Sequence, residues 1–226
     1  MKFPAIIFSE IIKQKIPGLK LGLLSATKIR VKKKSVIVDA EFEKLDRFIN
    51  EKFKSIPPSA DEVVSAVRRM YRRIGWEPTR YRPSSEAMIR RFIKNIGLYR
   101  INNLVDLGNV ASAHFHLPMG LYDLEKIKGE ICIDVGGEEE SYQGISKEII
   151  HATGKLILRD EISIFGNPTA DSQRTCISPE TKNALALFFT PPEIDDAYLN
   201  ETLSFLKKLY QSESSEVEVQ LSIQRT

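Results

Sequence analysis

Apolar side chains recur at two different spacings along this chain, and the spacing separates expected strands from expected helices. Short apolar runs bounded by glycine, proline or charged residues are typical of strands. Such runs predict strands at Leu19–Thr27, Val36–Ala40, Ile131–Val135, Lys155–Leu158, Ile162–Phe165, Ala184–Phe189 and Val217–Ile223. The runs on either side of Arg159-Asp160 are expected to pair as a hairpin, and the last strand is expected to lie at the edge of a sheet.

Apolar positions three and four residues apart predict helices between these strands. A first helix is expected to begin at the capping box Ser59-x-x-Glu62 and to end at Gly75, with an apolar face made of Val63, Val67, Met70, Tyr71 and Ile74. After an extended connector, Trp76–Pro83, a second helix is expected to begin at Ser84 and to end at Gly97, with an apolar stripe at Ile89, Phe92, Ile93 and Ile96.

A third helix is expected from Asn102 or Asn103 to about Phe115, and an amphipathic helix is expected at Ala197–Tyr210. The third helix has small side chains, which let another backbone or a ligand approach it, at Gly108, Ala111, Ser112 and Ala113. Strands grouped with clustered helices, without strict alternation, predict an α+β fold with a mixed β-sheet core and helices packed against it. We expect one domain over residues 1–226, with 1–58 as an integrated N-terminal part and 193–226 as a C-terminal helix and tail.

The composition is that of an ordinary soluble globular protein, with 42% hydrophobic and 28% charged residues. No apolar run reaches the roughly 18 residues that span a bilayer, and the first residues do not resemble a signal peptide, so a cytoplasmic protein without membrane contact is expected. Cys132 and Cys176 lack Cys-x-x-Cys spacing and are expected to be free thiols. His114 and His116 do not share a helical face, so no metal site is expected.

Positive charge is concentrated in one stretch of the sequence. Residues 68–100 contain ten basic and two acidic residues, a net charge of +8, whereas the whole chain has a net charge of only +3. Nine of the ten are arginines, whose planar guanidinium suits bidentate contacts with phosphate. We expect the first-helix arginines to form a solvent-facing row that binds a polyanion, with a merely solvated helical face as the alternative. The residues expected to contact nucleic acid are Arg68, Arg69, Arg72, Arg73, Arg80, Arg82, Arg90 and Arg91.

Four short motifs occur in an informative order. They are Val105-Asp106-Leu107-Gly108-Asn109, Pro118-Met119-Gly120-Leu121-Tyr122-Asp123, Ile164-Phe165-Gly166 and Glu180-Thr181-Lys182-Asn183. Over about residues 88–189, their order and spacing resemble the B3/B4 module of the phenylalanyl-tRNA synthetase beta subunit. The segments Arg80–Ser84 and Asp171–Thr175 resemble the free-standing branch of that family, which lacks the rest of the synthetase.

The resemblance implies an editing site that hydrolyses misacylated tRNA, because the synthetase module performs that reaction. Two departures change the expected specificity. Gly120 stands where the module has a histidine, and Leu187 aligns with the glutamate that recognises the tyrosine hydroxyl there. Without those groups the site should not select tyrosine, so the expected substrate is another aminoacyl-tRNA. A chain of 226 residues is too short to hold a catalytic synthetase domain as well, so ligase activity by this chain alone is not expected.

Ester hydrolysis needs a substrate pocket, a positioned water and donors directed at the oxyanion. The candidate catalytic residues are Asn109, Asp106 and Asp123. The two aspartates have an alternative structural role, in which they hold the Arg80–Arg82 connector. The candidate pocket residues are Asn102, Asn103, Gly108, Gly120, Gly166, Arg174 and Thr175, of which the first two have helix capping as their alternative role. Asn109 and Arg174-Thr175 are expected to share one pocket.

Three functions remain compatible with the sequence. The first is a trans-acting aminoacyl-tRNA deacylase, the second is a non-catalytic RNA- or tRNA-binding module, and the third is a binding protein for a free amino acid or small metabolite. The expected partner in the first two is tRNA or aminoacyl-tRNA, with no DNA. No P-loop, dinucleotide-binding glycine motif or metal-ligand cluster is present in the sequence, so we expect activity without nucleotide or metal cofactors.

Overall fold

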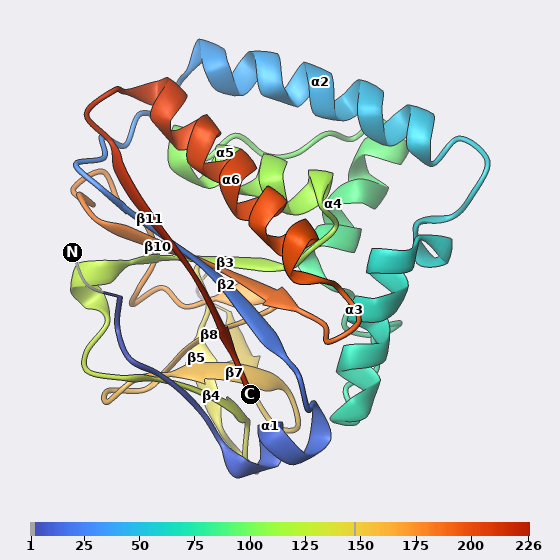
Figure 1. Ribbon diagram of the computed structural model, residues 1–226, viewed down its shortest axis with the longest axis vertical. Helices are drawn as coiled ribbons and strands as arrows, with labels where there is room; N and C mark the ends of the chain where they lie inside the picture. Colours follow the sequence, from blue (N-terminus) through green and yellow to red (C-terminus); the bar gives the residue numbers. More distant parts are fainter. Residues whose placement is uncertain (1–2, 147) are drawn as a thin grey trace.

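Two β-sheets form the centre of the molecule in the computed structural model, which describes residues 3–146 and 148–226 (Figure 1). The first sheet is antiparallel in the order β11-β2-β10-β3, with strands at Glu218–Arg225, Lys20–Thr27, Ala184–Thr190 and Met119–Asp123. The second has the order β1-β4-β7-β8-β9, with strands at Ile6–Phe8, Ile131–Val135, Leu156–Arg159, Ile164–Asn167 and Ala170–Asp171. Among the described residues of these two sheets, β1 and β4 are the only strands that pair in parallel, and the other strand pairs are antiparallel.

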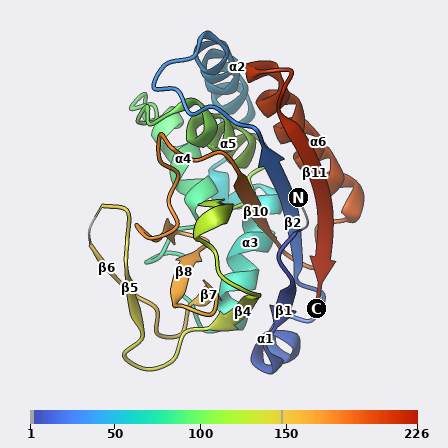
Figure 2. The same cartoon turned by 90° about the vertical axis from the view of Figure 1, so that its left-hand side faces the viewer.

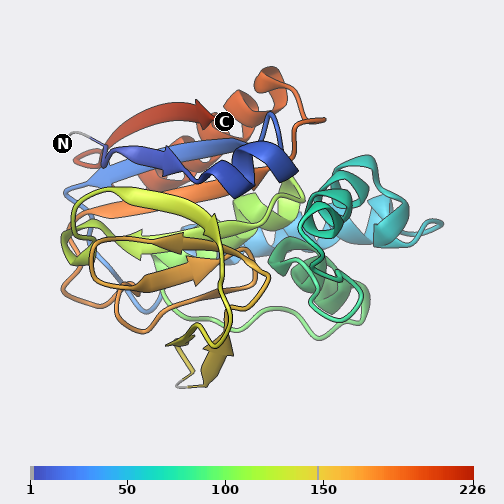
Figure 3. The ribbon, with the colours of Figure 1, turned by 90° about the horizontal axis from the view of Figure 1, so that it is seen from below.

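A short two-stranded ribbon packs on the edge of the second sheet through Tyr142, which contacts Ile157 and Ile164. Strands β5 (Ser141–Gln143) and β6 (Ile149–His151) pair with each other and extend away from the body of the molecule (Figures 2 and 3). The α-helices are α1 at Glu10–Lys15, α2 at Val36–Lys52, α3 at Glu62–Arg73, α4 at Ser84–Ile93, α5 at Asn103–His114 and α6 at Asp196–Glu213. Two 3₁₀ turns, at Pro58–Ala60 and Leu124–Lys126, connect these elements.

Helices α5 and α6 pack on the antiparallel sheet, α5 against β3 and α6 against β2, and α2 packs on α5 (Figure 1). Gly22 of β2 allows the close approach of α6, because a Cβ there would lie 2.6 Å from the Leu199 Cδ1 atom. Strand β10 lies between β2 and β3, and all seven of its residues are buried. This packing places α5 between β3 and α2, and residues of its first two turns line the two pockets described below.

The α+β prediction is confirmed, and so are several of the expected elements. Asn102 is the N-cap of α5, strands β7 and β8 pair antiparallel, and β11 lies at a sheet edge. Of the expected N-terminal part, residues 1 and 2 lie outside the described residues. No helix in the described part of the chain is long and apolar enough to cross a bilayer.

The expected strand at Val36–Ala40 is wrong, because these residues form the beginning of α2. Ser35 caps the helix by accepting hydrogen bonds from the amides of Ile37 and Val38. The buried stripe of α2 is Val38, Leu45 and Ile49, at helical spacing, whereas Val36 is 82% exposed. Packing of that stripe on the rest of the protein outweighs the local preference of β-branched residues for strands.

The boundaries of α3 and α4 also differ from expectation. The N-cap of α3 is Asp61, whose carboxylate accepts from the amides of Val63 and Val64, while Ser59 lies in the preceding 3₁₀ turn. Helix α4 begins after Pro83 without a side-chain cap and ends at Ile93. Asn95 then takes a positive φ, which ends the helix two residues before the expected Gly97, and Ile96 is exposed.

Candidate active site

Helix α5 positions the candidate site, and its first turn is fixed by Asn102. The Asn102 side-chain oxygen accepts the Val105 amide at 2.9 Å, as expected of an N-cap residue. Gly108 lies where α5 meets β3 and α6, because a Cβ there would lie 2.5 Å from Met119 Cε and 3.4 Å from Tyr210 Oη. The missing side chain therefore lets the helix approach its neighbours closely. Asn109, the next residue, is half-buried at the edge of a pocket.

This pocket, named here the Asn109 pocket, has a volume of about 120 Å³. Its walls come from the first two turns of α5 and from Ile101 just before the cap of that helix, from β3, from Ile145 in the loop between β5 and β6, and from the segment that follows β8. The lining residues are Ile101, Val105, Asn109, Met119, Leu121, Ile145, Asp171, Cys176 and Ile177. Most of the wall is apolar, so the Asn109 amide and the Asp171 carboxyl supply most of its hydrogen-bonding capacity.

Asp171 has an unusual environment for a carboxylate. Its Oδ2 atom accepts the Leu121 amide at 3.2 Å, but no described residue lies in hydrogen-bond geometry with the buried Oδ1 atom. Burial raises the pKa of Asp171 to about 7, and the nearby Tyr122 hydroxyl and the Leu121 amide offset only part of that effect. Asp171 is therefore a carboxyl group that changes protonation near neutral pH.

Tyr122 explains why glycine occupies two of the predicted pocket positions. A Cβ at either Gly120 or Gly166 would overlap the Tyr122 hydroxyl, so the buried phenol occupies the space between these two glycines. Leu187 of β10 lies directly opposite Gly120 of β3. The positions at which the synthetase module has histidine and glutamate are thus cross-strand neighbours, and neither carries a polar side chain in this chain.

The two other candidate catalytic residues, Asp106 and Asp123, hold structural hydrogen bonds. Asp106 accepts the Ile101 amide through both carboxylate oxygens, at 3.0 and 3.3 Å, and burial raises its pKa. Asp123 accepts the Thr181 hydroxyl at 2.7 Å and the Glu125 amide at 3.1 Å. The expected alternative, in which they hold the Arg80–Arg82 connector, is wrong, because these bonds go to other segments. Neither aspartate lines the Asn109 pocket.

The residues Arg174 and Thr175 do not line the Asn109 pocket either. Arg174 donates to the Lys126 carbonyl and to the Asp160 carboxylate, both at 2.8 Å, and the Thr175 hydroxyl is buried 2.9 Å from the Ser172 hydroxyl. The expected sharing of one pocket is therefore wrong for these two side chains. Their loop does reach the pocket, through the flanking residues Asp171, Cys176 and Ile177.

The expected row of solvent-facing arginines is also wrong in part. Arg68 donates to Glu86 at 2.9 Å, and the two side chains are only 14% and 0% exposed. Glu86 also pairs with Arg90 at 2.8 Å and with Arg82 at 3.7 Å, because these residues lie one helical turn on either side of it. A buried carboxylate thus holds Arg68 in the fold.

The remaining arginines of the predicted polyanion surface are more accessible. Arg69 and Arg73 share Glu193 at 3.5 and 2.7 Å, and Arg72 is exposed. Arg80 lies over the Tyr81 ring, and Arg91 lies over the Tyr99 ring while donating to the Gly97 carbonyl. The surface of α3 and α4 therefore keeps basic groups in solvent, although several are neutralised by carboxylates.

The histidines near the end of α5 lie apart from the Asn109 pocket. His114 stacks between the rings of Phe48 and Phe205, and the His116 Nδ1 atom lies 2.9 Å from the Asp61 carboxylate. Within residues 3–146 and 148–226, no cluster of three or more His, Cys, Asp or Glu side chains could hold a metal ion.

Comparison with known proteins identifies the family. Residues 66–198 match the model of the B3/4 domain, so this chain belongs to the B3/4 domain family. The phenylalanine–tRNA ligase beta subunit of Fusobacterium nucleatum subsp. nucleatum is 32% identical over 136 residues, which cover 52% of this chain and 16% of that protein. The same subunit of Rickettsia felis is 36% identical over 84 residues, which cover 36% of this chain and 10% of that protein.

Two further relatives extend the comparison. The uncharacterised protein YhzB of Bacillus subtilis is 29% identical over 97 residues, which cover 43% of this chain and 40% of that protein. An N-terminal fragment of the phenylalanyl-tRNA synthetase beta subunit from Pyrococcus horikoshii matches 95% of this chain and 50% of that fragment, with 12% identity and a TM-score of 0.47. The chain spans only 16% and 10% of the two ligase subunits above, and the resemblance expected from the motifs is confirmed at the level of the family.

The sequence motifs located the site but missed its most distinctive group. Asp171 begins the Asp171–Thr175 segment that resembles the free-standing branch, yet the expected pocket residues of that segment were Arg174 and Thr175. Asp171 is the last residue of short strand β9, where its side chain accepts the Leu121 amide of β3. No local pattern predicts that long-range contact.

Proposed function

We propose that this protein binds aminoacyl-tRNA and hydrolyses the ester of a mischarged species in trans. The family relationship to phenylalanine–tRNA ligase beta subunits gives the tRNA context. One observation carries the catalytic part of the proposal: Asp171, buried beside the Tyr122 hydroxyl and with a pKa of about 7, lines the same small pocket as Asn109. A general base is most effective when its pKa lies near the working pH.

The proposed chemistry uses water as the nucleophile. Deprotonated Asp171 takes a proton from water as the water oxygen bonds to the ester carbonyl carbon. The Asn109 side-chain NH₂ donates to the developing oxyanion. The bond from the carbonyl carbon to the ribose oxygen then breaks, and the proton passes from Asp171 to that oxygen. The products are a free amino acid and tRNA with its terminal hydroxyl restored.

The dimensions and walls of the Asn109 pocket support a small, apolar aminoacyl side chain. A dry cavity of about 150 Å³ is large enough to take up benzene, and the Asn109 pocket has about 120 Å³. Met119, Leu121 and Ile177 provide apolar walls. Gly120 and Leu187 stand at the positions that recognise a phenolic hydroxyl in the synthetase module and carry no polar side chain, so we do not expect tyrosine to be the preferred substrate.

The basic surface of α3 and α4 supports the contact with tRNA in this proposal. Its members would be Arg69, Arg72, Arg73, Arg80, Arg82, Arg90 and Arg91, whereas Arg68 holds Glu86. Close to the pocket, Arg100 precedes Ile101 and lines a groove with Lys33 and Lys34. Arg100 also pairs with Asp39 of α2, so Lys33 and Lys34 are the cations of this groove that would attract the phosphates of an acceptor end.

A deacylation screen over a panel of mischarged tRNAs tests this function. Release of a small apolar amino acid, accelerated over the spontaneous rate, is the expected result. The absence of the two polar family groups at Gly120 and Leu187 favours a second candidate, a tRNA-binding module without catalysis. Salt-sensitive binding of every tRNA in the panel, with no release of any amino acid, would contradict the first proposal and support the second.

A further inference from the structure

A second and larger pocket lies on the opposite face of α5. Leu104 and Leu107 line it, whereas Val105 and Asn109 line the Asn109 pocket, and helical geometry places these pairs on different faces. The second pocket, named here the Glu213 pocket, has a volume of about 320 Å³, which is within the range of small-molecule sites. Its floor consists of buried apolar or aromatic side chains: Ile29, Leu104, Leu107, Tyr210 and Val217.

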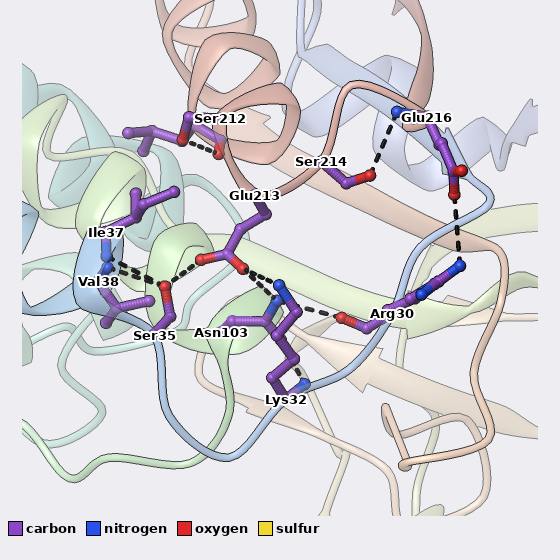
Figure 4. A network of polar contacts seen from close by, with 11 residues as sticks. Arg30, Lys32, Ser35, Ile37, Val38, Asn103, Ser212, Glu213, Ser214 and Glu216 are labelled. Atoms are coloured by element: carbon purple, nitrogen blue, oxygen red, sulfur yellow. Dashed lines mark hydrogen bonds and ion pairs between the residues drawn. The ribbon is translucent and has the colours of Figure 1, made fainter.

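One side of this pocket carries the Glu213 carboxylate, which is only 8% exposed (Figure 4). Glu213 accepts from Lys32 Nζ at 3.2 Å, from Asn103 Nδ2 at 3.0 Å and from the Ser35 hydroxyl. Asn103 in turn accepts the Lys32 amide at 2.8 Å and donates to the Arg30 carbonyl at 3.2 Å. Asn103 therefore belongs to the wall of this pocket and not to the Asn109 pocket.

A second ion pair, more exposed than the contacts of Glu213, lies at the mouth of the Glu213 pocket. The Arg30 and Glu216 side chains lie 3.5 Å apart and are 73% and 64% exposed, so little free energy is needed to separate them. Together with Lys32 and Glu213, the pocket has two cationic and two anionic side chains, which balance. A ligand with a single charge would compete for one member of the Arg30–Glu216 pair and leave the other without a partner.

We infer that the Glu213 pocket binds a free apolar α-amino acid in its zwitterionic form. The ligand enters between Arg30 and Glu216, its carboxylate pairs with Arg30, and its ammonium pairs with Glu216. Its side chain covers the apolar floor formed by Leu104, Leu107 and Val217. This inference is independent of the proposed hydrolysis, because an aminoacyl group on tRNA has no free carboxylate for Arg30.

The neighbouring ion pair provides a matched control. Lys28 pairs with Glu218 in the same way that Arg30 pairs with Glu216, on adjoining positions of the same two segments, but neither Lys28 nor Glu218 lines the pocket. Replacing Lys28 removes a cation of equal charge from the same surface without changing the site. Any effect of surface charge alone would therefore appear in both variants.

The test is a titration of methyl-labelled full-length protein with L-leucine, followed by NMR at neutral pH. We expect saturable shifts at the Leu104, Leu107 and Val217 methyl groups. The dissociation constant should rise about three- to tenfold in Arg30→Met and stay unchanged in Lys28→Met. L-Leucine methyl ester, which lacks the carboxylate, and 4-methylpentanoate, which lacks the ammonium, should each bind more weakly than L-leucine by a similar factor.

Several results would overturn the inference. They are absence of saturable binding of L-leucine in the millimolar range, equal binding of the methyl ester, and equal affinity in Arg30→Met and wild type. Shifts confined to Leu121 and Ile177 would assign the amino acid to the Asn109 pocket instead. Because the spectrum of Arg30→Met reports its own folding, loss of binding through misfolding is distinguishable from loss of the carboxylate partner.

Discussion

Helix α5 has a pocket on each of two faces, and each pocket contains one largely buried carboxyl group, Glu213 in one and Asp171 in the other. Glu213 receives hydrogen bonds from three side chains, whereas Asp171 receives one from the Leu121 amide and lies beside the Tyr122 hydroxyl. Hydrogen bonds to the charged form stabilise a carboxylate, and burial without them favours the protonated form. Burial with few hydrogen bonds suits Asp171 to proton transfer, while the three side-chain contacts of Glu213 suit a fixed structural role beside its pocket.

The largest effect is expected from Asp171→Asn. The amide keeps the shape of the side chain but cannot accept a proton from water, so deacylation should fall about 10²- to 10⁴-fold. Single-turnover hydrolysis of a mischarged tRNA from the active panel measures the change. Glu43→Gln, which removes an exposed carboxylate on α2, serves as the charge-matched control and should retain full activity. Equal rates for Asp171→Asn and wild type would remove Asp171 from the chemistry.

Asn109→Ala tests the other polar group of the same pocket. Loss of one donor to an oxyanion typically lowers the rate about 10²- to 10³-fold. The affinity for tRNA should stay nearly constant, because Asn109 lies inside the pocket and away from the basic surface. A parallel measurement of tRNA binding and deacylation separates these effects. Reduced binding with an unchanged rate in the bound complex would contradict the assigned role.

Glu213→Ala should affect stability more than chemistry. Its removal leaves Asn103 and Ser35 without their common acceptor in a largely buried site, which should lower the free energy of unfolding by about 2–3 kcal/mol. Glu218→Ala removes the exposed partner of Lys28 and should change stability little. Urea unfolding of both variants measures the loss of unfolding free energy in each. Equal losses in the two variants would show that Glu213 does not stabilise the fold through its buried hydrogen bonds.

Asp171→Asn should also make stability less dependent on pH. Since the folded-state pKa of Asp171 is raised from about 3.8 to about 7, its contribution is fully present below pH 4 and is lost as pH rises through 7. Wild type should therefore lose on the order of 1 kcal/mol relative to the variant between pH 4 and 8, after allowance for partial exposure. Thermal unfolding of both proteins between pH 4 and 8 measures this difference in stability. Stability curves of wild type and variant that run parallel against pH would contradict the raised pKa.

Arg72→Ala should produce the smallest change, confined to tRNA binding. If Arg72 contacts one phosphate, the slope of log affinity against log salt should become shallower by about 0.7–0.9. Lys208→Ala, an exposed cation on α6, is the matched control and should leave the slope unchanged. Identical slopes for the two variants would exclude the exposed α3 arginine from the tRNA contact.

Sequence patterns predicted the elements whose structure depends on neighbouring residues in the chain. Asn102 was identifiable as a helix cap, and the run at Ala184–Phe189 as a buried strand, because both follow from neighbouring residues. The beginning of α2 could not be identified as a helix from the sequence. Val36, Ile37 and Val38 favour strands locally, and only tertiary packing selects the helix. Helix periodicity likewise placed Arg68 in solvent, but Glu86 of the next helix holds it.

The site was predictable as a region and not as a set of groups. The motif around Asn109 and the Asp171–Thr175 segment each contribute a residue to the Asn109 pocket. The loop residues that line the pocket depend on how the chain turns after β9, where Arg174 pairs with Asp160. The raised pKa of Asp171 depends on burial by segments far away in sequence, which residue patterns do not encode.

The most direct test of the account is the pH dependence of deacylation under kcat/KM conditions, from about pH 5 to 9, with spontaneous hydrolysis subtracted. If Asp171 is the base, kcat/KM should rise with pH to a plateau with a midpoint near the pKa of about 7, since the free enzyme must be deprotonated. The same rise should be absent in Asp171→Asn. A wild-type profile without this midpoint, or one that Asp171→Asn reproduces, would contradict catalysis by the Asn109 pocket.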